Sequence, residues 1–275
     1  MKLINNPYKL LVVDIDGTLV GKDRTISVEN KEALAKVYDS GIKVSLSTGR
    51  AYQACLGIIN QLSLDGEHIF FDGALVSNPN QNKEVYVQPL SQVVVRQMVE
   101  FAHLNDINLE LYSATRYFAE RETWSTNAHR QFFGLEPTIV DFTKLWNQER
   151  IIKGGLVTIS PEEVAKARSF YLQFNNSLHF SRARSPAYPG IDFVNIVAPE
   201  VSKGKALEAL ASYLGISLSQ VIAIGDGTND ISLLSLAGLA IAMGNALDEV
   251  KAVADYITLD ADHSGLASAI NKFLL

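Results

Sequence analysis

Two carboxylates, one residue apart, follow an apolar run near the start of the chain. Residues 10–13 are aliphatic and β-branched and predict a buried strand, which ends in Asp14 and Asp16 with Gly17 permitting a turn. Positions i and i+2 of a strand point to the same side, so both carboxylates can face one pocket. Anions about 4 Å apart repel by about 4 kcal/mol at an effective dielectric near 20, and a cation or shared proton must compensate. Asp-Gly is also a common turn signal, so a plain loop is the alternative.

Polar residues follow two later strands in the same way. One predicted strand spans 42–46 and another spans 221–224. In an open parallel sheet, ligands bind in the crevice beyond the carboxyl ends of the strands, where residues distant in sequence meet. The candidate site residues at the three strand ends are Asp14, Asp16, Thr48, Gly49, Asp226, Asn229 and Asp230.

The segment 225–230, Gly-Asp-Gly-Thr-Asn-Asp, only half matches the dinucleotide fingerprint G-x-G-x-x-G. Asp230 occupies the position where the fingerprint has its third glycine. Asp226 would also place a carboxylate against the pyrophosphate of a dinucleotide. Carboxylates at two strand ends, with no His or Cys beside them, instead favour Mg²⁺ over Zn²⁺. Lys203 precedes a helix predicted over 205–214, and it is either a solvated charge or a cation serving these acids, with Lys205 as a nearby rival.

The pattern of elements predicts an α/β fold with a Rossmann-like parallel sheet, helices on both of its faces, and an inserted α+β unit. Strand, helix, strand, helix and strand alternate within about the first seventy residues, and the alternation resumes after residue 190. Between them, helices at 92–104 and 161–174 accompany paired strands, including a hairpin turning at Ser113-Ala114. We therefore expect a core of residues 1–87 and 190–275 and an insertion of residues 88–189.

The composition describes an ordinary globular protein and excludes several classes. The 275 residues are 47% hydrophobic and 20% charged, and the net charge of −6 argues against nonspecific nucleic-acid binding. Cys55 is the single cysteine, and its apolar helical surroundings predict a buried core residue rather than a nucleophile. The five histidines lack zinc-type spacing. With no export signal and no apolar run of membrane-spanning length, we expect a cytoplasmic protein without a membrane partner.

Four ordered segments resemble the motifs of the haloacid dehalogenase superfamily, and the pattern is similar to its Cof-like branch of phosphatases with a large inserted α/β cap. A fifth segment, at 243–246, resembles that branch's C-terminal signature. Asp72 departs from the pattern, because the branch usually has Asn there, and we carry no role onto it. The four motifs are Asp14-Ile15-Asp16-Gly17-Thr18, Ser47-Thr48-Gly49-Arg50, Val201-Ser202-Lys203-Gly204 and Gly225-Asp226-Gly227-Thr228-Asn229-Asp230.

The resemblance implies phosphoryl transfer through an aspartyl-phosphate. Asp14 would be the nucleophile, and Asp16 would protonate the leaving oxygen and then deprotonate water. Mg²⁺ would bind Asp14, the backbone carbonyl of Asp16, and Asp226, with Asp230 orienting metal waters or Lys203. The resemblance places the phosphoryl oxygens against the Ile15 amide, Thr48, Gly49, Lys203 and Asn229.

The resemblance also implies that the substrate is a small phosphorylated metabolite and that the insertion closes over the site. Sugar phosphates are the first expectation, and cofactor phosphates such as phosphorylated flavin or pyridoxal are the second. The alternatives are a phosphomutase or phosphotransferase using the same nucleophile, a phospho-receiver switch, and a noncatalytic binding protein. The oligomeric state stays open. Cap residues that are candidates to touch substrate are Tyr112, Arg116, Arg182, Arg184 and Tyr188.

Overall fold

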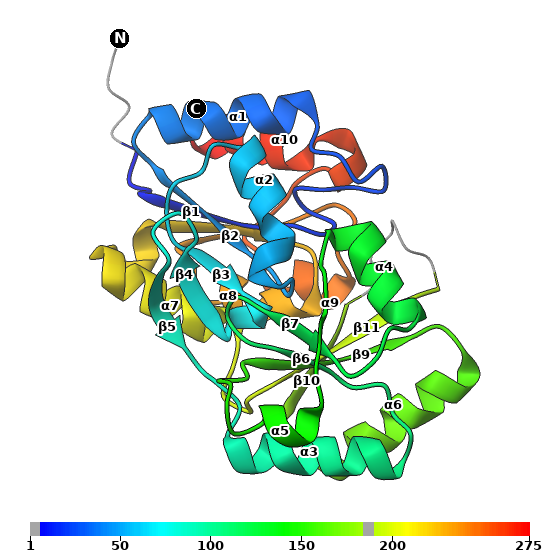
Figure 1. The fold of residues 1–275 in the computed structure, drawn as a ribbon. Coiled ribbons are helices and arrows are strands. Elements are labelled where there is room, and N and C mark those ends of the chain that lie inside the picture. The colour runs from blue at the N-terminus through cyan, green and yellow to red at the C-terminus, as the bar shows by residue number, and fades with distance from the viewer. Residues whose placement is uncertain (1–5, 184–189) are drawn as a thin grey trace.

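The computed structural model describes residues 6–183 and 190–275 and arranges them around two sheets (Figure 1). The first sheet has the strand order β14-β13-β12-β1-β2-β3-β4-β5. Its strands from β14 to β3 are parallel, and β4 and β5 add an antiparallel edge. The strands are β1 (Leu10–Asp14), β2 (Lys43–Ser47), β3 (His68–Phe70), β4 (Leu75–Asn78), β5 (Lys83–Val87), β12 (Val221–Gly225), β13 (Leu239–Ala242) and β14 (Tyr256–Ile257).

Strand β1 is central because both of its faces are apolar. Leu11 and Val13 pack into one hydrophobic cluster, whereas Leu10 and Val12 pack into another on the opposite face. The first cluster includes α1 (Val28–Asp39) and α10 (Gly265–Phe273), which pack together; the second includes α7 (Lys203–Leu214) and α8 (Ile231–Leu234). Helices therefore cover both faces of the sheet, as the sequence predicts. The remaining helices of this part are α2 (Leu56–Gln61) and α9 (Asp248–Lys251).

The second sheet has the strand order β10-β11-β9-β6-β7-β8 and is antiparallel except for the pairing of β7 with β8. Figure 1 shows α3, α5 and α6 on the side of this sheet that is turned away from the first sheet. The strands are β6 (Glu110–Tyr112), β7 (Tyr117–Ala119), β8 (Thr138–Ile139), β9 (Lys153–Thr158), β10 (His179–Ala183) and β11 (Asp192–Val197). The helices are α3 (Gln92–Leu104), α4 (Trp124–Phe133), α5 (Phe142–Leu145) and α6 (Pro161–Phe174).

Local patterns predicted most of these elements, and the differences have physical causes. Helices α3 and α6 span the predicted residues, and β6 and β7 form the predicted hairpin. The sequence did not reveal β4, β8, α4 or α5. Strand β11 pairs with β9 and β10 in the second sheet, beyond the expected boundary at residue 189, because an extended segment does not specify its partner.

The described residues contain no helix with the length and apolar character needed to cross a membrane.

Candidate active site

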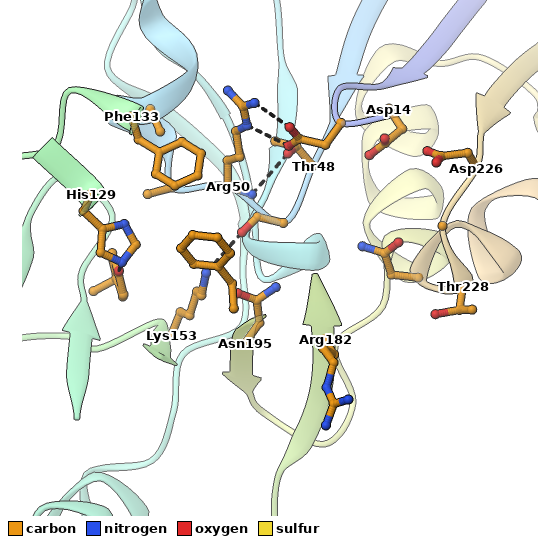
Figure 2. A pocket seen from close by; sticks show the side chains of 18 of the residues that line it. Asp14, Thr48, Arg50, His129, Phe133, Lys153, Arg182, Asn195, Asp226 and Thr228 are labelled. Carbon is orange, nitrogen blue, oxygen red and sulfur yellow. Dashed lines mark hydrogen bonds and ion pairs between the residues drawn. The ribbon is translucent and has the colours of Figure 1, made fainter. Parts of the chain in front are cut away.

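The predicted strand ends meet at a cavity of about 450 Å³ between the two sheets (Figure 2). Asp14 ends β1, Thr48 follows β2, and Asp226 follows β12; because these strands are parallel neighbours, their carboxyl ends share one edge. The opposite wall comes from the second sheet and from α4. The cavity therefore lies where the open α/β sheet places its ligands.

Lys203 connects acids from two distant segments beneath the cavity. Its Nζ donates to Asp14 Oδ1 at 2.7 Å, to Asp230 Oδ1 at 2.6 Å and to the Ser47 carbonyl at 3.2 Å, which accounts for its three hydrogens. The side chain is fully buried. Burial alone would lower the pKa of Lys203, but Asp14 and Asp230 raise it well above its ordinary value. Lys203 is therefore a permanent cation under Asp14, rather than the solvated charge that was its alternative.

Asp226 approaches the same point from β12. Thr18 Oγ1 donates to its Oδ1 at 3.1 Å, and Asn245 Nδ2 donates to its Oδ2 at 3.0 Å. Gly17 lies so close that a Cβ there would be 2.2 Å from Asp226 Oδ2, and its φ of +91° also favours glycine. The turn after β1 is thus shaped to admit the second carboxylate.

The acidic cluster fits a divalent cation. Carboxylate oxygens of Asp14, Asp226 and Asp230 all lie within 4.8 Å of one another, and Lys203 is the cation that directly contacts two of them. Burial and the neighbouring Asp230 raise the pKa of Asp14 well above its ordinary value, and the same two causes raise the pKa of Asp226 to about 7. Hard oxygen ligands with surplus negative charge suit Mg²⁺. Asp230 is already engaged, since its Oδ2 accepts from the backbone N–H groups of Asp226 and Gly227.

We expect Mg²⁺ to stabilise the folded protein, and to do so more strongly at about pH 8 than at about pH 5.5. Asp226 has a raised folded pKa, so the folded state holds a proton more tightly than the unfolded state, and stability without metal improves as the pH falls through 7. Above pH 7 the ionised cluster repels itself, and a bound cation removes that repulsion. Thermal melts with Mg²⁺ and with chelator at both pH values measure this. The Asp226→Asn variant serves as the comparison; an equal Mg²⁺ shift in that variant would contradict the assignment.

Asp16 is held by the residue that follows the Thr48-Gly49 turn. Arg50 Nε and Nη2 donate to Asp16 Oδ2 and Oδ1 at 2.7 and 2.5 Å, a bidentate ion pair that Figure 2 shows beside Thr48. Thr48 Oγ1 accepts from the Arg50 backbone N–H at 3.1 Å. Asp14 and Asp16 both line the cavity, as the spacing predicts, although their partners differ: a lysine for one and an arginine for the other.

Comparison with known proteins agrees with this geometry. A family model described as haloacid dehalogenase-like hydrolase matches residues 11–270. The chain is 28% identical to the putative phosphatase YxeH of Bacillus subtilis, over 98% of this chain and 99% of that protein. It is also 28% identical to 5-amino-6-(5-phospho-D-ribitylamino)uracil phosphatase YcsE of the same organism, over 97% and 96%. The solved structure of the HAD subclass IIB sugar phosphatase BT4131 is 27% identical with a TM-score of 0.80, covering 96% of this chain and 98% of that one.

The chain belongs to the haloacid dehalogenase-like hydrolases. It is a phosphatase of the Cof-like branch, as its four motifs suggest, and its substrates are phosphorylated molecules.

Asp72, the departure from the branch pattern, joins the two sheets of this phosphatase. Its Oδ2 accepts from Ser181 Oγ of β10 at 2.7 Å and from Asn195 Nδ2 of β11 at 2.8 Å, and its Oδ1 accepts from Asn229 Nδ2 at 2.7 Å. Its φ of 56° lies in the left-handed region, which Asp and Asn tolerate better than most residues. Burial raises the pKa of Asp72, but Lys203 and the hydrogen bond from Ser181 outweigh burial and hold the pKa below its ordinary value.

Replacing Asp72 by Asn should destabilise the protein by about 1–3 kcal/mol, because an amide nitrogen would face donors that now bind a carboxylate. The loss is measured by chemical denaturation. Ser181→Ala is the matched control, since it removes one of the three donors and leaves the carboxylate in place. If Asp72→Asn is no less stable than Ser181→Ala, Asp72 does not join the sheets.

Three of the five residues predicted to bind the phosphoryl group line the cavity. Thr48, Gly49 and Asn229 line the cavity, whereas Lys203 lies beneath it and the Ile15 side chain is buried in the core. Asn229 donates to Asp72, and a Cβ on Gly49 would be 2.8 Å from Asp72 Oδ1, so the turn requires glycine.

Among the cap candidates, the cavity receives Tyr112 and Arg182, while Arg116 pairs with Glu149 outside it. Arg184 and Tyr188 lie outside the described residues. Sequence reasoning missed six lining residues of the second part because nothing in the local pattern distinguishes them: His129, Phe133, Leu135, Lys153, Phe193 and Asn195. Arg50 stood within a quoted motif, but its pairing with Asp16 was not foreseen.

Proposed function

We propose that this phosphatase hydrolyses phosphomonoesters of small metabolites with Mg²⁺ through an aspartyl-phosphate on Asp14. The observation that carries the proposal is that Asp14 and Asp226 meet at one cavity while Lys203 and Asp230 contact each other, and Lys203 contacts Asp14, beneath it. Asp14 Oδ1 is held by Lys203, and Oδ2 accepts no hydrogen bond from the described part of the chain. Oδ2 is therefore the oxygen available to attack phosphorus.

The chemistry divides into two displacements. Asp14 Oδ2 bonds to phosphorus as the bond to the leaving oxygen breaks, and Asp16 gives that oxygen its proton. Water then attacks the acyl phosphate, Asp16 takes a proton from it, and the Asp14 carboxylate and inorganic phosphate are restored. To do this, Asp16 must separate from Arg50, take up from solvent the proton that it later gives, and turn toward the leaving oxygen, so Arg50 acts as the resting partner of the carboxylate.

Charge is the main obstacle, because an anionic nucleophile meets an anionic phosphate. Lys203 favours the ionised form of Asp14 from below and so opposes the rise in its pKa, and Thr48 and Gly49 present polar groups at the cavity after β2. Mg²⁺, held by Asp14, the Asp16 carbonyl and Asp226, would supply the remaining positive charge. Asp230 holds Lys203 and the β12 turn in place.

We propose that the second sheet and its helices form a cap that encloses the leaving group. Asp72 contacts β10 and β11, and Lys153 Nζ of β9 donates to the Gly49 carbonyl at 3.2 Å, so the cap contacts the core beside the phosphate-binding turn. Sugar phosphates are supported as a substrate class by the sugar phosphatase BT4131, and phosphates with a planar ring by YcsE.

The test is phosphate release from a panel of sugar and cofactor phosphates, with excess Mg²⁺ and with chelator. We expect free phosphate only with Mg²⁺. Transfer of the phosphoryl group to a second metabolite, in place of water, would instead establish the phosphotransferase alternative. Absence of both reactions across the panel would contradict the proposal.

A further inference from the structure

The structure describes two buried lysines, Lys203 and Lys153, and their surroundings differ. Lys203 contacts two carboxylates, whereas Lys153 has no carboxylate within ion-pair distance among the described residues. Within residues 6–183 and 190–275, the one hydrogen bond from Lys153 Nζ goes to the neutral Gly49 carbonyl, so two of its three hydrogens find no acceptor there. A buried ammonium without an anion is costly, and such a group at a cavity needs a partner from outside the chain.

Lys153 faces the cavity from the cap rather than from the acids of the core. Figure 2 shows it grouped with His129 and Phe133, apart from Asp14 and Asp226. Arg182, also on the cap, lines the same cavity. Arg182 pairs with Asp192 at 3.8 Å, so Lys153 is the cation on the cap side of the cavity that has no carboxylate within ion-pair distance among the described residues.

Lys153 packs against Tyr112, which belongs to a buried hydrogen-bond network around Glu110. Its Nζ lies 5.1 Å from the centre of the Tyr112 ring, and the Tyr112 hydroxyl donates to the buried Glu110 at 2.8 Å. Glu110 also accepts from Tyr117 and Ser125, and it pairs with His129 Nε2 at 2.8 Å. Burial lowers the pKa of Lys153, while Asp72 and Glu110 oppose that effect without contacting it. The ammonium is thus held in place with its free hydrogens unpaired.

We propose that Lys153 is a specificity-determining residue that binds an anionic oxygen on the leaving group. The substrate class is then a phosphomonoester whose alcohol also carries a carboxylate or a similar anion. This inference rests on the proposed phosphatase function and specifies its substrate. Rings of Tyr112, His129, Phe133 and Phe193 line the same side of the cavity, so a flat or apolar portion can accompany the anion.

The test compares phosphomonoesters whose leaving group does or does not carry a carboxylate. The probes are 3-carboxybenzyl phosphate, neutral 3-carbamoylbenzyl phosphate and benzyl phosphate, together with 6-phosphogluconate and glucose 6-phosphate as the sugar pair. We expect kcat/KM to be about thirtyfold higher for the carboxylated member of a pair, since a charge-assisted hydrogen bond is lost in the neutral one. Equal values within both pairs, with phosphate released from all arms, overturn the inference and leave the phosphatase proposal standing. No release from any arm overturns both.

Variants separate substrate binding from structural support. Lys153→Met should reduce the ratio of kcat/KM for carboxylated over neutral probes to about one, and Lys153→Arg should retain part of that ratio. Lys144→Met, which changes an exposed side chain on α5, should leave the ratio unchanged. Lys153→Met should melt no lower than the wild type, because it replaces an unpaired buried charge with an apolar side chain of similar size. An unchanged ratio, or a fall in kcat/KM that is the same for every probe, would show that Lys153 does not contact the leaving-group anion.

Discussion

Asp14→Asn is expected to abolish phosphate release, with kcat reduced at least about a thousandfold and the fold retained. The amide cannot attack phosphorus, and it also removes one of the negative charges that a divalent cation would offset. Lys203 keeps its contact with Asp230, so the buried cation is still paired and the protein should remain folded. The measurement is phosphate release under excess Mg²⁺, with circular dichroism and a thermal melt on the same sample.

Asp39→Asn is the matched control, because Asp39 is an exposed carboxylate at the end of α1, away from the cavity. It should retain the wild-type rate. Asp14 is not the nucleophile if Asp14→Asn is folded and still turns over at more than a small percentage of the wild-type rate.

Lys203→Met should lose both activity and stability. Removing one partner of a buried ion pair leaves the others uncompensated and typically costs about 3–5 kcal/mol. Asp14 and Asp230 would then lie close together without their shared cation, and Asp14 would be harder to ionise for attack. Denaturant unfolding measures the stability, and phosphate release measures the activity. Lys205→Met, on the exposed side of the same helix, should change neither by much.

The effect of pH distinguishes lost pairing from lost packing. In the wild type the folded pKa of Lys203 is raised, so its contribution to stability is complete below the ordinary lysine pKa and is lost only as the pH rises through the folded value. In Lys203→Met the unpaired Asp14 has an even higher folded pKa, and protonation relieves it. The stability deficit should therefore shrink as the pH falls from about 8 to about 5. A deficit independent of pH would indicate a packing defect instead.

The sequence alone determined the parts of this protein that depend on local chemistry. The apolar run before Asp14, and the strands before Thr48 and Asp226, specify a buried parallel sheet, and that topology places their ends at one edge. Helix α6 was predictable from Ser160 and Pro161, because Ser160 and Glu163 form a capping box and proline suits the first turn. Side chains that act through such short-range rules can be predicted from the sequence.

The partner of each side chain depends on how distant parts of the chain pack together. Strand β11 reads as an extended segment in any sheet, and its pairing with β9 is a long-range contact. The same holds for Asp72, whose three donors lie 109, 123 and 157 residues away, and for Arg50, which reaches back to Asp16. Lys203 stands in a motif that predicts its place beside the acids, whereas no local pattern predicts that Lys153 faces the cavity from the other sheet. Burial and pairing are properties of the packed chain, and no local pattern contains them.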